Sequence, residues 1–159
     1  MLLWFVGVGV LMVWVVFQSP ALDVRMVAVG LLLPWLDGLT GGPFVLHTLA
    51  GSVGLLALVM LLTRHSRVAR RTWLGLPIGT FLHLTLDAAW TRTALFWWPF
   101  GGDGAFDGPL PELDRSLGLL FVMELAGAAA LWWAWQAFGL GDPDRREELR
   151  TSGRLRPRS

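Results

Sequence analysis

The sequence predicts an all-α membrane protein, a polytopic bundle of about five transmembrane helices. Of its 159 residues, 54% are hydrophobic and only 16% are charged, and the mean hydropathy is +0.55. That is more apolar surface than a soluble domain of this length can bury. The charged residues fall mainly between long apolar runs, as expected when hydrocarbon excludes them.

The first two apolar runs predict the first two helices. Residues 2–17 lack the basic start of a signal peptide, so we expect a retained helix there. Ser19 and Pro20 then form an N-cap and first-turn pair, which opens a second helix over residues 21–39.

The second helix has an alternative interpretation. Asp23 and Arg25 near its start, and Pro34 further along, weaken the pattern of a membrane span. The chain would then have four spans, with residues 24–36 as a re-entrant segment.

Three further runs predict three more helices. A Gly-Gly-Pro break precedes the first of these helices. An Arg-rich loop precedes the second, and a long Gly-rich loop precedes the third. Gly75 and Gly79 form a small-residue motif that is typical of close helix packing. The three helices are expected over residues 44–62, 73–90 and 117–138.

Arginine placement predicts the orientation and the domain boundary. Positive charge is retained on the cytoplasmic side, so the loop over residues 63–72 and the C-terminal tail should share that side. We expect a transmembrane domain over residues 1–140 and a disordered, cytoplasmic Arg-rich tail over residues 141–159. The predicted location is the inner or plasma membrane, with membrane lipids as the first partner.

Composition excludes several classes of function. The chain has no cysteine, so disulfides, thiolate nucleophiles and cysteine-bound zinc are excluded. Its net charge is only +1, and its arginines do not alternate with aromatic residues, which argues against nucleic-acid binding.

Ionisable residues inside the apolar runs are the candidate site. Charge in hydrocarbon costs several kcal/mol, so such residues are functional candidates by default. His83 and Asp87 are four residues apart, which puts both on one helix face. In the five-helix arrangement they share one depth, in the outer half of the membrane, with Asp37, His47 and Glu124.

Imidazoles and carboxylates together predict a metal site. The mixed nitrogen and oxygen donors suit one divalent cation, such as zinc, manganese or magnesium, which could activate water for hydrolysis. We expect Asp37, His47, His83 and Asp87 as ligands. Glu124 would be a further ligand or the general base, and Arg92 would bind an anionic, amphiphilic substrate.

Two alternatives use the same residues. Each His could pair with a neighbouring carboxylate, so that a non-catalytic membrane protein uses the cluster for packing, ion binding or partner contact. A proton or ion transporter would also use buried His and carboxylates, but the chain shows no internal repeat.

Five short elements within residues 29–100 form a recognisable series. They are Leu33-Pro34-Trp35-Leu36-Asp37, His47-Thr48, His83-Leu84-Thr85-Leu86-Asp87, Thr91 and Trp97-Trp98-Pro99-Phe100. In these elements the chain resembles a bacterial family of membrane-bound metal-dependent hydrolases. The resemblance implies a membrane-embedded hydrolase that acts on a phosphoester or lipid-like ester at the extracytoplasmic side. Trp35 stands where that family has the first of two Asp residues, which favours one metal over two.

Overall fold

The computed structural model describes residues 1–159 except 19–21, 103, 112–113 and 158–159. The described residues form helices joined by turns and loops, so the all-α prediction is confirmed. The α-helices are α1 (Gly9–Phe17), α2 (Val24–Leu32), α3 (Leu49–Leu62), α4 (Arg67–Trp73), α5 (Gly75–Leu86), α6 (Thr93–Phe96), α7 (Leu117–Ala137) and α8 (Pro143–Ser152). Shorter helical segments are η1 (Trp4–Val8), η2 (Leu33–Thr40), η3 (Val45–His47) and η4 (Ala89–Thr91).

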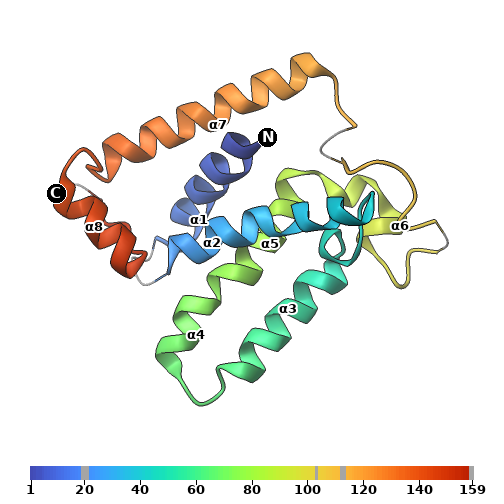
Figure 1. The fold of residues 1–159 in the computed structure, drawn as a ribbon, viewed down its shortest axis with the longest axis horizontal. Coiled ribbons are helices and arrows are strands. Elements are labelled where there is room, and N and C mark those ends of the chain that lie inside the picture. The colour runs from blue at the N-terminus through green and yellow to red at the C-terminus, as the bar shows by residue number, and fades with distance from the viewer. Residues whose placement is uncertain (19–21, 103, 112–113, 158–159) are drawn as a thin grey trace.

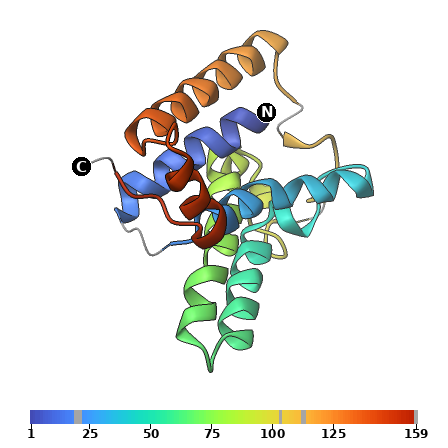
Figure 2. The ribbon, with the colours of Figure 1, turned by 60° about the vertical axis from the view of Figure 1, so that its left-hand side comes forward.

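Helices α2 and α5 pack against each other at backbone distance and lie side by side in both views (Figures 1 and 2). A Cβ atom on Gly30 would lie 2.1 Å from the Leu76 carbonyl oxygen, and one on Gly79 would lie 2.2 Å from that of Val27. Only glycine allows this approach. The close packing expected at Gly79 is therefore present, and it fixes the position of α5 and its C-terminal end.

The first helix, formed by η1 and α1 in continuation, crosses α7 where Gly7 meets Gly127. A Cβ atom on Gly7 would lie 2.2 Å from the Gly127 carbonyl oxygen. One turn before Gly127 on α7, the carboxylate of Glu124 accepts hydrogen bonds from the backbone N–H groups of Leu3 and Trp4 at 3.2 and 3.5 Å. Because these N–H groups start a helix and have no partner within it, Glu124 acts as their cap.

Helices α3 and α4 form a hairpin that extends away from α7 (Figure 1). Thr48 caps α3, because its hydroxyl accepts a hydrogen bond from the Gly51 N–H at 2.9 Å. Ser66 caps α4 in the same way through Ala69. The Arg-rich segment lies at the tip of the hairpin and along α4, while the base of the hairpin contacts η3 and α5.

The C-terminal segment contains helix α8, in a stretch where the sequence predicted a disordered tail. Helix α8 is capped at its start by the side chain of Asp142, and Gly153 follows its last residue as the C-cap. Leu155 is buried against Val10 and Phe138. Apolar periodicity is absent from this segment, but a few contacts with α1 and α7 are enough to hold it, and sequence pattern alone does not show them.

The predicted bundle of about five transmembrane helices is wrong. Only α7, with 21 residues, is long and apolar enough to cross a membrane by length and composition, within the part of the chain described. At 1.5 Å per residue α7 spans about 32 Å, against about 30 Å of hydrocarbon. Helices α2, α3 and α5 have 9, 14 and 12 residues and reach only about 14 to 21 Å.

The physical reason for this correction is that the apolar runs are interrupted. Asp23 caps α2 at its start, and α2 gives way to a 3-10 segment at Leu33 and Pro34. Thr48 likewise separates η3 from α3. The alternative of four spans with a re-entrant segment fails for the same reason, and a multi-pass topology is not supported.

Candidate metal centre

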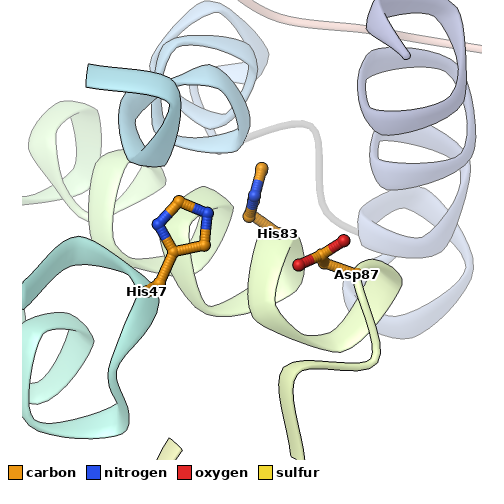
Figure 3. Close-up of side chains that lie close together, drawn as sticks. All are labelled: His47, His83 and Asp87. Atoms are coloured by element: carbon orange, nitrogen blue, oxygen red, sulfur yellow. The ribbon is translucent and has the colours of Figure 1, made fainter. Parts of the chain in front are cut away.

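Three buried side chains from two elements converge to form the centre. His83 lies in the last turn of α5, Asp87 caps that helix, and His47 ends the short segment η3. Their exposed fractions are 0%, 2% and 0%, respectively. One potential ligand atom from each lies within 4.8 Å of the others, and the three side chains point toward one another in Figure 3.

Asp37 orients His47 from behind. Its Oδ2 atom lies 2.9 Å from His47 Nδ1 and also accepts hydrogen bonds from the backbone N–H groups of His47 and Phe44, at 3.1 and 3.0 Å. A carboxylate that accepts from Nδ1–H leaves the Nε2 lone pair of the imidazole for a metal. Asp37, predicted as a metal ligand, therefore lies where its carboxylate fixes the tautomer and orientation of His47.

The backbone of α2 orients His83 in the same way. His83 Nδ1 lies 2.7 Å from the carbonyl oxygen of Leu31. A carbonyl only accepts, so Nδ1 carries the hydrogen and Nε2 carries the lone pair. Pro34 stands three residues after Leu31 and has no N–H, so this carbonyl has no donor from the 3-10 turn. The proline therefore leaves the carbonyl available to His83.

Aromatic rings enclose the imidazoles. The Phe5 ring stacks on His83, with centroids 4.0 Å apart and planes 11° from parallel. The His47 ring meets His83 edge-on at 5.3 Å, and Trp35 meets Phe5 edge-on at 6.2 Å. Trp35, at the position where the resembled family has an Asp, therefore packs against the aromatic wall of the centre.

Arg115 is the residue that sequence reasoning missed. Its Nη2 atom lies 3.1 Å from Asp87 Oδ1 and 2.6 Å from the Asp87 backbone oxygen. Arg115 directly precedes Ser116, the N-cap of α7, and the sequence predicts it only as the end of the long loop before that helix. No local pattern links residues 28 positions apart, so only the fold shows this ion pair.

Two predicted site residues are engaged elsewhere. Glu124 caps the first helix and lies 3.3 Å from the chain's amino terminus, outside the three-residue group. Arg92 binds the loop before α7, with Nη2 2.7 Å from Asp114 Oδ2 and Nη1 2.8 Å from the Pro109 oxygen. Their expected roles as ligand or base and as substrate contact gain no support from these contacts.

Thr91, which follows His83 and Asp87 in the series that resembles the hydrolase family, does not lie on the same helix as His83. Ala88 has φ of 53°, a left-handed conformation that stops α5, and Thr91 lies in the separate segment η4. The Thr91 hydroxyl donates to the Ala88 oxygen at 2.9 Å. The third member of the expected His, Asp and Thr series is therefore a turn residue.

The donor set fits a metal. Two imidazole nitrogens and one carboxylate oxygen are the protein ligands of many catalytic zinc sites, which keep a fourth position for water or substrate. Both imidazoles also have the outer hydrogen bond that usually orients metal-bound histidine. What the arrangement could do chemically is hold one divalent cation with a vacant coordination position.

The chain matches no family model, no curated protein and no solved structure. The resemblance to membrane-bound hydrolases therefore stays a prediction that depends on the residues of this chain alone.

Proposed function

We propose that this protein is a metal-dependent hydrolase that binds one divalent cation, most suitably zinc, through His47, His83 and Asp87. The observation that supports the proposal is the convergence of three buried donor groups within 4.8 Å, with each imidazole oriented by a hydrogen bond on its far side. Hydrogen bonds of this kind are the ones that usually orient metal-bound histidine.

A bound cation would supply an activated water and polarise an ester or phosphoryl oxygen. Asp37 would stabilise the positive charge that builds on His47 as that ring donates its lone pair. Arg115 lies beside Asp87 and carries a guanidinium, which suits a substrate phosphate or a developing oxyanion. These roles favour a phosphoester or lipid-like ester as the substrate.

A non-catalytic role is the second candidate. It is favoured by the ion pair between Arg115 and Asp87 and by the stacking of Phe5 on His83, which both stabilise the cluster by themselves. In that case the centre is a buried polar network that fixes the ends of η3 and α5.

Metal content distinguishes the two candidates. Wild-type protein purified without added chelator should hold about one divalent ion per chain by elemental mass spectrometry. His83→Ala and His47→Ala should each lose it. His65→Ala is the matched control, because the third histidine of the chain is exposed between α3 and α4. Equal metal content in all four proteins, or none in the wild type, would contradict the hydrolase proposal.

A further inference from the structure

An apolar cleft lies between α1, α3 and α5. Its volume is about 370 Å³, which is within the range of ligand pockets, roughly 300–1000 Å³. Every residue that lines it is apolar except Ser52. Met12 of α1, Leu56 of α3 and Phe81 of α5 show how the three helices contribute.

The cleft borders the candidate metal centre. Leu49, which lines it, follows His47 by two residues, and Leu82, which also lines it, directly precedes His83. Both leucines place the lining of the cleft close to the centre along the chain, while His47 and His83 are themselves buried and do not line it.

Ser52 is the polar group in this apolar wall. Its side chain is buried, with 4% exposed, and among the described residues its Oγ atom has no hydrogen-bond partner. A buried hydroxyl without a partner is costly, so such an atom points to a polar group supplied from outside the chain. In the cleft, that group would belong to a ligand that is otherwise apolar.

We propose that this cleft binds the acyl chain of a single-chain lipid ester, with Ser52 contacting the polar end of the chain and the ester reaching the metal centre. The proposal deepens the hydrolase function and rests on it for the identity of the substrate. A partner helix is a poorer occupant. One helical turn, about 10 Å wide and 5.4 Å long, already occupies on the order of 400 Å³, so the cleft would enclose no more than one turn.

Photolabelling tests the acyl-chain site directly. The probe is hexadecanoic acid with a terminal diazirine, added to the purified full chain in EDTA, followed by peptide mass spectrometry. We expect the label on peptides of α1, α3 and α5. Unlabelled competitors should gain about fourfold in potency for each added methylene until the cleft is full.

Two substitutions on α3 provide a matched pair. Leu56→Trp fills the cleft and should reduce labelling at least fivefold, whereas Leu58→Trp, on the same helix and also exposed, lines no described pocket and should leave it unchanged. Ser52→Ala should lower the potency of the unlabelled competitors several-fold, up to about tenfold. Equal labelling of Leu56→Trp and Leu58→Trp, or label spread evenly over the exposed helices, would overturn the acyl-chain site.

The labelling experiment and the measurement of metal content together also distinguish this proposal from the hydrolase function. Labelling in EDTA does not require a metal, so loss of the cleft labelling with metal content intact would overturn only the acyl-chain site. Labelling of the cleft in a protein that binds no metal would support acyl-chain binding and overturn the hydrolase.

Discussion

Asp37 Oδ2 accepts from the side chain and from the backbone of His47, at 2.9 and 3.1 Å. One carboxylate oxygen therefore fixes both the ring orientation of the histidine and the short segment that carries it. This double contact makes Asp37 a positioning residue for the candidate metal centre.

Asp37→Asn should weaken metal binding about 10- to 100-fold, because the amide lacks the charge that supports a metal-bound imidazole. The affinity can be measured by competition against a chelating dye. Asp107→Asn is the control, because Asp107 lies exposed in the loop before α7. An Asp37→Asn protein with wild-type affinity would show that the contact only shapes the backbone.

Arg115→Gln should lower kcat/KM for an anionic phosphoester substrate about 10- to 1000-fold while metal content is retained, because a guanidinium beside the centre would stabilise negative charge. Arg92→Gln is the matched control, since Arg92 pairs with Asp114 in the neighbouring loop. Steady-state kinetics with matched neutral and anionic esters should show a loss confined to the anionic one. If Arg92→Gln shows that loss and Arg115→Gln does not, the two arginines have the opposite roles.

The sequence predicts the residues of the candidate metal centre better than it predicts the arrangement of the helices. The spacing of His83 and Asp87 places them together on any helix, whatever surrounds it, and the structure keeps that pair. The sequence could not show that Asp37 orients His47. An Asp that binds a metal directly and an Asp that hydrogen-bonds to a metal-binding histidine look the same in sequence. The contacts of Glu124 with the N-terminal helix could not be predicted, because they depend on how that helix meets α7 at Gly7 and Gly127.

The number of spans was mispredicted for a related reason. Hydropathy averages over a window and does not register single residues that start or interrupt a helix, such as Asp23, Pro34 and Ala88. Small residues did carry a correct signal, because Gly79 lies where α5 meets α2. Short-range features such as the packing glycine could therefore be predicted from the sequence, while helix ends and long-range contacts could not, because they depend on the fold.

Gly79→Ala should destabilise the protein by roughly 1–3 kcal/mol, because its Cβ would lie 2.2 Å from the Val27 carbonyl oxygen, a rigid backbone atom. Gly54→Ala on α3 is the control. A Cβ there meets nothing within 4 Å, and alanine favours a helix by about 0.5–1 kcal/mol over glycine. Thermal unfolding of both variants should give opposite shifts, and a stabilised Gly79→Ala would contradict the packing of α2 on α5.

The ion pair between Arg25 and Asp23 joins the start of α2 to the C-terminal segment. Arg25 donates to both carboxylate oxygens of Asp23 and to the Arg150 oxygen, while the Val24 N–H donates to the Gly153 oxygen at 2.9 Å. Burial of Asp23 acts to raise its pKa, but hydrogen bonds and the charge of Arg25 outweigh it and lower the pKa below the ordinary 3.8. Because the folded state lowers this pKa, the contact stabilises fully above about pH 3.8 and is lost as pH falls through the lowered value.

Asp23→Asn should therefore release the segment at neutral pH and speed tryptic cleavage at Arg150 and Arg154 several-fold, as measured by mass spectrometry over time. Gly153→Ala should do the same, because a Cβ there would collide with the Asp23 carboxylate and Gly153 has φ of 68°. Asp144→Asn, in the exposed first turn of α8, is the control for a lost charge nearby. Cleavage at the wild-type rate in both Asp23→Asn and Gly153→Ala would show that Leu155 and its apolar neighbours alone retain the segment.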